Sequence, residues 1–308
     1  EGVLDILEVK FPDKGTLITP SFGKPTGMRF FLMLRTLGCF AACLTKATGG
    51  KMPADHETIR IWGLAGGSSS EDFFLFREVL GGGGPGRPWA DGSDVVHIVP
   101  NSRNLPAEFS ETRYPIFIEK LGLKEDSAGA GYRRGGFGYD KQIKTLVDAR
   151  LISNADRSVL RCYGAYGGKA GGPYSVSVLH KSSQETKHPG MCDTVTVPSK
   201  DSVRIVTTGG GGWGDPLKRE IDKVVYDLQC GLISENAARE QYGVVVYLEG
   251  RKWIADLDKT SILREKMANS NENLPMFDRG DEFKRIKEKG IITYPENWTD
   301  PDEGWYLS

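Results

Sequence analysis

The stretch Thr208-Gly-Gly-Gly-Gly-Trp-Gly-Asp-Pro216 indicates how this chain is built. Glycine has no Cβ, so a run of glycines lets backbones approach closely, but the run loses much conformational entropy when it becomes ordered. Two similar runs lie upstream, at Gly81-Gly-Gly-Gly-Pro-Gly86 and Arg134-Gly-Gly-Phe-Gly138. Because aromatic side chains lie within or beside all three runs, we predict ordered and closely packed backbone rather than flexible linkers.

The same stretch carries the spacing of a dinucleotide-binding loop, with Gly209, Gly211 and Gly214 between a predicted strand and a predicted helix. Asp215 follows at once and would place a carboxylate where a pyrophosphate binds. No strand that ends in an acidic residue follows about 20 residues later, as a dinucleotide-binding unit requires. We therefore predict a structural turn that packs Trp213 and no nucleotide cofactor bound here.

A second stretch, Gly167-Gly-Lys-Ala170, resembles the end of a phosphate-binding loop. Ala170 stands where such a loop carries the Ser or Thr that binds Mg²⁺, and Tyr163 stands in place of the first glycine. We expect no ATP binding by this chain alone.

Short segments rich in β-branched and aromatic residues, bounded by Gly, Pro and Asn, predict strands between the glycine runs. They are residues 59–64, 73–80, 95–99, 116–123, 139–146, 158–163, 174–179, 194–197 and 203–207. The last two flank the turn 198–201 and predict a hairpin. Strands without intervening helices predict a mainly β fold of antiparallel barrel-like or sandwich sheets, with glycine-rich loops of polyproline II type and a few packed helices.

Helices are expected on both sides of the strand region. Residues 26–46 are apolar over most of a helical circumference, which predicts a core helix. The apolar run 30–44 is short for a membrane span and contains Arg35. Asp215 is expected to cap a second helix that Gly231 ends, and Ser234 a third, before a final strand at 244–247.

Composition limits the classes of function. The 308 residues include 40 basic and 41 acidic side chains, so the basic surface expected of a nucleic-acid-binding protein is missing. The five cysteines are an odd number without a regular framework, which indicates reduced thiols in a cytoplasmic protein.

The richest polar segment runs from Asp91 to Glu111. Its amides and guanidinium could donate hydrogen bonds to a developing oxyanion or to a phosphate. The structural alternative is that Asn and Asp satisfy loop backbone and that Arg103 pairs with Glu108 or Glu111. The catalytic candidates are Asn101, Arg103, Asn104 and Glu108, and the substrate-binding candidates are Asp94 and His97.

No metal site is predicted from the other histidines. His56 lies between Asp55 and Glu57, but adjacent loop residues rarely converge on one ion, so we expect a solvated turn. His180 and His188 lie in a Lys- and Ser-rich stretch that is typical of a surface.

Taken together and in order, several motifs resemble the C-terminal half of the hydantoinase B/oxoprolinase family. They are Asp91-Gly-Ser-Asp94, Pro100-Asn-Ser-Arg-Asn-Leu-Pro-Ala-Glu108, Ala128-Gly-Ala-Gly-Tyr-Arg-Arg-Gly-Gly-Phe-Gly138, Tyr166-Gly-Gly-Lys-Ala-Gly-Gly-Pro173, Pro198-Ser-Lys200, Thr208–Pro216 and Gly231-Leu-Ile-Ser-Glu-Asn-Ala-Ala-Arg239. The resemblance covers roughly residues 1–248, and residues 249–308 are a charged, partly helical extension that Trp298 and Trp305 could pin to a neighbouring surface. Many family members carry a second His beside His97, where this chain has Ile98.

The resemblance implies a subunit, or a fragment of one, of an ATP-dependent multisubunit enzyme that acts on a phosphorylated carbonyl intermediate. We expect hydrolytic opening of a cyclic amide such as a hydantoin, oxoproline or a lactam. Alternatives are a subunit of a ketone carboxylase of the acetone or acetophenone kind, and a non-catalytic scaffold half.

Its partners and cofactors are also implied. ATP and Mg²⁺ would bind to a hydantoinase A-like partner subunit. The chain starts at Glu1, and its first residues match the middle of the family's long subunit, so we expect a fragment or one piece of a split subunit. The missing N-terminal half carries the family's His-x-x-Asp motif, and any divalent metal would be expected there. Neither nucleic acid nor a membrane is expected as a partner.

Overall fold

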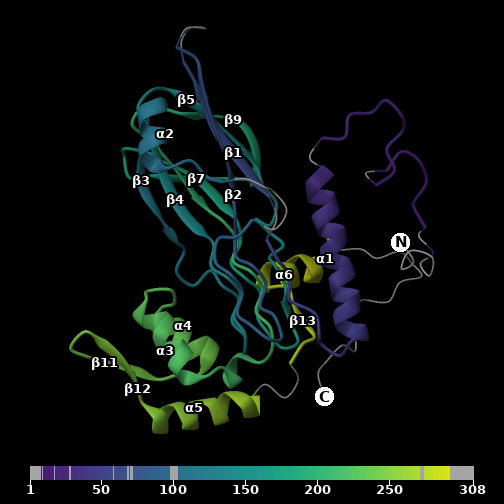
Figure 1. The fold of residues 1–308 in the computed structure, drawn as a ribbon, viewed down its shortest axis with the longest axis vertical. Helices are drawn as coiled ribbons and strands as arrows, with labels where there is room; N and C mark the ends of the chain where they lie inside the picture. The colour runs from purple at the N-terminus through teal and green to yellow at the C-terminus, as the bar shows by residue number, and fades with distance from the viewer. Residues whose placement is uncertain are drawn as a thin grey trace.

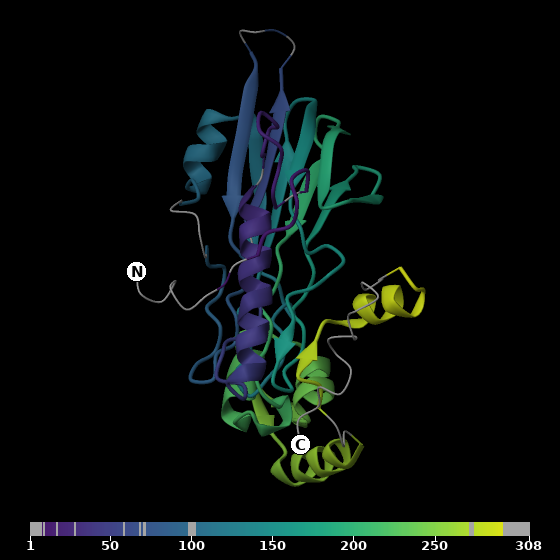
Figure 2. The same ribbon diagram turned by 90° about the vertical axis from the view of Figure 1, so that its right-hand side faces the viewer.

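The computed structural model describes residues 8, 10–16, 18–27, 29–57, 59–67, 69, 72–97, 103–270 and 274–291. Two antiparallel sheets lie face to face, and a glycine-rich region extends from one end of them (Figure 1). Helix α1 (Arg29–Ala47) runs along one flank. Helices α3 (Ile221–Gln229) and α4 (Glu235–Tyr242) lie at the far end of the glycine-rich region, as the second view also shows (Figure 2).

The sheets form a sandwich. The first has the order β2 (Phe74–Leu80), β1 (Arg60–Gly66), β5 (Ala149–Asn154) and β9 (Met191–Val197). The second has the order β3 (Ile116–Leu123), β4 (Tyr139–Thr145), β10 (Ser202–Val206), β7 (Ser175–Leu179) and β8 (Glu185–His188). The predicted antiparallel sandwich is confirmed, and the sheets do not close into a barrel.

Alternation along each strand fills the space between the sheets. On β2, Phe74, Phe76 and Leu80 are buried, while Leu75 and Arg77 face outward. The core joins residues of both sheets, among them Trp62, Leu64, Ile143, Leu151, Val176 and Ile205. Burying each large apolar side chain contributes roughly 1.5–3 kcal/mol, so this core is a principal source of stability.

The predicted hairpin between 194–197 and 203–207 is wrong. β9 pairs with β5 in the first sheet, whereas β10 pairs with β4 and β7 in the second. The turn 198–201 therefore carries the chain from one sheet to the other. Val197 and Val203, on either side of the turn, are both buried in the core between the sheets.

Two further predicted strands are also absent from the described residues. Within 95–97, Val96 makes only an isolated bridge with Gly82, and Val95 has φ of 46°. Residues 158–163 form no strand. The strands β5 and β8 were not predicted, because their polar and charged residues obscure the alternation of apolar and polar positions that is typical of a strand.

The glycine runs pack against one another as segments that are neither helix nor strand. Gly210 donates its amide to the Gly136 carbonyl at 3.0 Å, and Gly211 to the Asp55 carbonyl at 3.0 Å. A Cβ on Gly211 would lie 1.8 Å from the Tyr163 carbonyl oxygen. Among Gly209–Gly214 only Gly214 has a positive φ, of 74°, so close approach rather than backbone conformation requires the run.

The helices after the glycine runs begin and end near the predicted residues, except that the helix predicted from Asp215 is divided into two. Asp215 accepts a hydrogen bond from the Leu217 amide at 2.9 Å, but it caps only a single 3₁₀ turn, Pro216–Lys218. α3 starts separately at Ile221 and ends before Gly231, which has φ of 68°. Ser234 caps α4 by accepting from the Ala237 amide at 3.0 Å.

The C-terminal extension folds back onto the rest of the molecule. The hairpin of β11 (Val246–Glu249) and β12 (Lys252–Ala255) leads into α5 (Leu257–Ser270). β13 (Phe277–Asp278) then pairs with β6 (Gly164–Ala165), and α6 (Asp281–Glu288) follows. The predicted domain boundary at 248/249 lies inside β11, and the division into two domains stays a prediction. The strand expected at 244–247 is not the last one, because β12 and β13 follow it. Trp298 and Trp305 lie outside the described residues.

Helix α1 is not the predicted core helix. Phe31, Leu34, Gly38 and Thr45 are its buried residues, whereas Phe40 is 54% exposed. The helix covers one flank and therefore contacts the body along one face (Figures 1 and 2). Its 19 residues and mean hydropathy of 1.4 satisfy the requirements of a membrane span by length and composition alone, a criterion that core helices of soluble proteins also meet.

Candidate functional site

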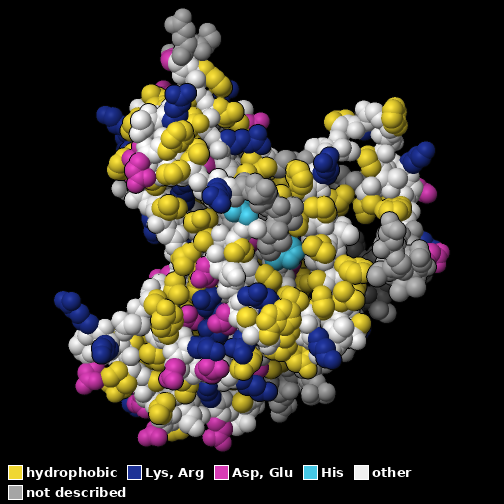
Figure 3. Space-filling view, viewed as in Figure 1, with side chains coloured by type: hydrophobic (Ala, Val, Ile, Leu, Met, Phe, Trp, Pro, Cys, Tyr) yellow, Lys and Arg dark blue, Asp and Glu magenta, His cyan; other side chains and the backbone are white. Residues whose placement is uncertain are grey.

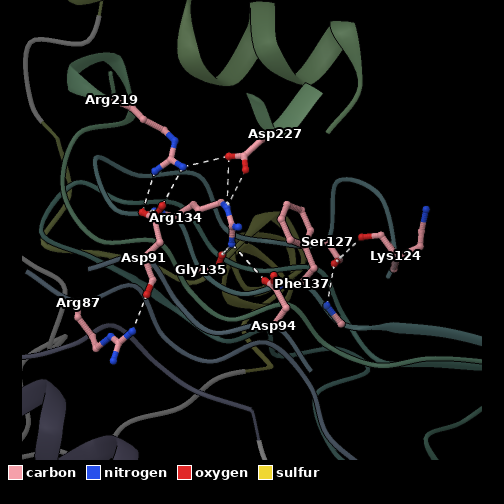
Figure 4. Close-up of polar contacts among 11 residues, drawn as sticks. Arg87, Asp91, Asp94, Lys124, Ser127, Arg134, Gly135, Phe137, Arg219 and Asp227 are labelled. Atoms are coloured by element: carbon pink, nitrogen blue, oxygen red, sulfur yellow. Dashed lines mark hydrogen bonds and ion pairs between the residues drawn. The ribbon is translucent and has the colours of Figure 1, made fainter. Parts of the chain in front are cut away.

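The start of the predicted polar segment is part of a buried network of ion pairs (Figure 4). Arg219, 1% exposed, binds Asp91 with both terminal nitrogens, at 2.8 and 2.9 Å. Asp227 of α3 accepts from Arg219 at 3.0 Å and from Arg134 at 3.2 Å. Burial by itself raises the pKa of Asp91, but the hydrogen bonds and charge of Arg219 outweigh it and lower that pKa below its usual value.

Asp94, a substrate-binding candidate, belongs to the same network. Its Oδ1 accepts from the Phe137 amide at 2.9 Å and from Arg134 at 3.2 Å. The Arg134 guanidinium also lies over the Phe137 ring, 4.6 Å from its centroid. Asp94 therefore holds the glycine-rich segment 134–138 in place, and its role toward a substrate stays a prediction.

His97 and Asn104 are brought together. The Asn104 amide nitrogen donates to the Val79 carbonyl of β2 at 2.9 Å, and its oxygen lies 3.4 Å from His97 Nε2. His97 Nδ1 is buried without a hydrogen-bond partner in the described structure. Asn101 lies outside the described residues. The pair thus lies beside β2, the edge strand of the first sheet.

The other two candidates do not join that pair through a described contact. Arg103 is exposed, and Glu108 is exposed in the first turn of α2 (Ala107–Arg113). Glu111 accepts a hydrogen bond from the Ile118 amide at 2.8 Å. No ion pair links Arg103 to Glu108 or Glu111 in the part of the chain that the structure describes, so the structural alternative for Arg103 has no support there.

The expected solvated turn around His56 is wrong. Asp55 and Glu57 are each 1% exposed and His56 is 9% exposed. Glu57 binds Arg60 at 2.6 Å, and Arg60 donates to the Thr208 hydroxyl at 2.8 Å beside the glycine run. Each carboxylate is buried with an arginine partner: Asp55 binds Arg157, 102 residues away in the sequence, and Glu57 binds Arg60 of β1. The charged residues directly before strand β1 were the feature of the sequence from which these buried ion pairs could have been predicted.

Polar atoms of the His56 triplet contact groups of the chain itself. His56 Nδ1 lies 2.6 Å from the Glu57 carbonyl oxygen, and Asp55 binds Arg157. No group of three or more His, Cys, Asp or Glu side chains suited to a metal ion occurs among the described residues. Burial raises the pKa of the nearby Cys162 thiol, and the Asp55 carboxylate raises it further, so this thiol stays protonated and is no nucleophile.

Charged side chains of both signs gather on the lower part of the face in Figure 3, over the glycine-rich region and α3. Apolar side chains are exposed toward the side where Figure 1 places α1. This distribution agrees with the balanced charge of the chain.

The comparisons with known proteins agree on the family. The profile of the hydantoinase B/oxoprolinase family matches residues 1–216. One component of the putative D-/L-hydantoinase of Pseudomonas sp. (strain NS671) is 27% identical over 266 residues, which are 86% of this chain and 44% of that protein. The chain thus spans less than half the length of this relative.

Two solved structures share the fold. The ATP-dependent caprolactamase from Pseudomonas jessenii superposes with a TM-score of 0.70 and 25% identity, over 86% of this chain and 47% of that one. A nucleotide-free acetone carboxylase gives a TM-score of 0.67 over 94% of this chain and 48% of that one; at 19% identity it shows a common fold alone. With its glycine-rich core, its sandwich and the match over residues 1–216, the chain belongs to the hydantoinase B/oxoprolinase family.

Proposed function

We propose that this chain is part of an ATP-dependent enzyme that opens a cyclic amide through a phosphorylated carbonyl intermediate. The observation that carries the proposal is the superposition on the ATP-dependent caprolactamase over 86% of the chain. An unstrained amide is a poor electrophile, and phosphorylation of its oxygen supplies the driving force for attack by water. Arg103 and Asn104 would donate hydrogen bonds to the developing oxyanion.

ATP and Mg²⁺ would bind to a hydantoinase A-like partner. The stretch that resembles a phosphate loop supports this division, because its amides are used within the chain. Gly168 donates to the Ala165 carbonyl at 3.0 Å, and Lys169 to the Ala130 carbonyl at 2.7 Å. We also place the complex in the cytoplasm, since all five cysteines are free thiols.

The test is an activity screen of the assembled complex. The chain is co-expressed with an upstream segment that carries the His-x-x-Asp motif and with a kinase-like partner. ADP release is then measured with a hydantoin, 5-oxoproline, caprolactam, and acetone plus bicarbonate. We expect amide-dependent ADP release that disappears when this chain is omitted.

Each other outcome has a distinct meaning. Incorporation of labelled bicarbonate into a ketone would assign the chain to a carboxylase instead. Amide-dependent ADP release in the absence of this chain would show that the chain is a non-catalytic scaffold. The isolated chain should neither hydrolyse nor tightly bind ATP, and micromolar binding by calorimetry would contradict the assignment of ATP to the partner.

A further inference from the structure

A cavity of about 240 Å³ lies where four segments far apart in the sequence meet. Its walls come from α1, the loop at Asp55, residues 157–163, and the β13–α6 segment of the C-terminal extension. None of the predicted site residues lines it. Four arginines do, together with a single carboxylate: Arg35, Arg157, Arg161, Arg279 and Asp55.

The carboxylate is already bound by the chain itself. Asp55 accepts a hydrogen bond from Arg157, and its Oδ1 accepts from the His56 amide at 3.0 Å. Arg35 Nη1 lies 3.7 Å from Asp55 Oδ2. Asp55 thus holds the Arg157 guanidinium by a hydrogen bond, and its negative charge offsets one of the four positive charges that line the cavity.

Arg35 has hydrogen-bonding capacity that the protein leaves unused. All three of its guanidinium nitrogens are shielded from solvent, yet none makes a hydrogen bond in the described structure. Its ion-pair contacts, to Asp55 at 3.7 Å and to Asp156 at 3.3 Å, do not meet hydrogen-bond geometry. Buried donors are nearly always satisfied, so a shielded guanidinium of this kind indicates a missing acceptor.

The rest of the lining defines the shape of that acceptor. Phe277 and Phe283 provide apolar wall, and the Arg279 guanidinium lies over the Phe283 ring, 5.0 Å from its centroid. Burial raises the pKa of Tyr163, as does the Asp55 charge, so this phenol stays neutral; its hydroxyl donates to the Gly38 carbonyl at 2.9 Å. A ligand in the cavity therefore meets both guanidinium groups and aromatic rings.

We propose that this cavity binds a small oxyanion, the phosphate or carboxylate head of a molecule with a short apolar body. The planar guanidinium fork matches both kinds of head, because two N–H groups can donate to two oxygens at once. The apolar body would pack against the phenylalanines. The site is additional to the predicted catalytic segment, and it requires the C-terminal extension as one of its walls.

Calorimetric titration of the full chain tests the site, with inorganic phosphate and hexanoate as separate probes at constant ionic strength. Stronger binding of phosphate indicates a phosphate site, and stronger binding of hexanoate a carboxylate site with an apolar wall. We expect Arg35→Gln and Arg161→Gln each to weaken binding about tenfold, the size of a lost charge-assisted hydrogen bond. Arg77→Gln, an exposed arginine on β2, is the matched control. No binding of either probe, or equal affinity in all three variants, would overturn the proposal.

A second measurement needs no variant and so avoids any loss of fold. Cys39 and Cys230 are both exposed thiols, but of the two only Cys39 lines the cavity. Alkylation of both is followed by mass spectrometry while the probe concentration rises. The bound anion should slow modification of Cys39 several-fold and leave Cys230 unchanged. Equal rates at Cys39 with and without a saturating probe would contradict an occupant in this cavity.

Discussion

Arg219 and Asp91 form a two-point ion pair across 128 residues of sequence, at 2.8 and 2.9 Å, and the arginine is almost fully buried. Removing one partner of such a pair leaves an uncompensated buried charge. We expect Arg219→Met to lower the free energy of unfolding by about 3–5 kcal/mol. Arg239→Met, at an exposed site on α4, is the control and should change it little. Equal denaturation midpoints for the two variants in urea would show that the network is not structural.

Sequence could predict the features of the fold that depend on local pattern. The glycine runs, the strands at 116–123 and 139–145 and the Ser234 cap all follow from neighbouring residues. Strand partners could not be predicted, because β9 and β10 alternate in the same way although they belong to different sheets. The burial of α1 was misjudged for a related reason, since an apolar circumference does not tell which face another element covers.

Local sequence pattern was also insufficient to predict the contacts of the candidate site. Asp94 and Asn104 are close in sequence, but Asp94 contacts Arg134 and Asn104 contacts Val79. The arginine cavity combines residues from 35 to 283, so no local motif could have revealed it. Long-range contacts decide which polar residues of one segment are structural and which face outward.

Asp140 on β4 gives the fold a defined sensitivity to acid. Arg204 binds its two carboxylate oxygens at 2.8 Å each, and Lys120 binds at 2.6 Å. Burial by itself raises the pKa of Asp140, but these cations outweigh it and lower the pKa to about 2. A carboxyl whose pKa is lower in the folded state stabilises the fold above its unfolded pKa of about 3.9. That contribution is lost as the pH falls from about 4 to about 2.

We therefore expect Asp140→Asn to be less stable than the wild type at pH 6 and the difference to shrink below pH 4. Urea unfolding at a series of pH values measures it. Asp222→Asn, an exposed position on α3, should show no such convergence. A difference between Asp140→Asn and wild type that stays constant down to pH 2 would mean that Asp140 acts through packing rather than through its charge.

Arg103 and Asn104 remain the residues on which the proposed catalysis depends. We expect Arg103→Ala and Asn104→Ala to abolish turnover of the assembled complex while the complex still forms. Arg103 is exposed, so its loss should leave the melting temperature unchanged; Asn104→Ala also removes the bond to Val79 and should lower stability by about 1 kcal/mol. Arg113→Ala, in the last turn of α2, is the control for a lost surface cation. Full activity in both test variants would place the site elsewhere.

Gly211 tests whether the longest glycine run is structural or holds a ligand. A Cβ there would lie 1.8 Å from the Tyr163 carbonyl oxygen, and backbone cannot move aside as a flexible side chain can. We expect Gly211→Val to cost about 3 kcal/mol or more and to unfold or disassemble the protein. Gly122→Val is the matched control, because a Cβ at Gly122 meets nothing within 4 Å. Valine also suits the strand β3 that contains it.

Thermal melting and size-exclusion chromatography of both variants decide the question. The close approach at Gly211 also holds the segment 209–214 against residue 163, beside the arginine cavity, so a distortion there should spread into the packing of α1 and β13. A Gly211→Val protein with the wild-type melting temperature that has lost only catalysis would mean that the run binds a substrate or phosphate. The amide of Gly211, which donates to the Asp55 carbonyl at 3.0 Å, would then have to exchange that partner for the ligand during turnover.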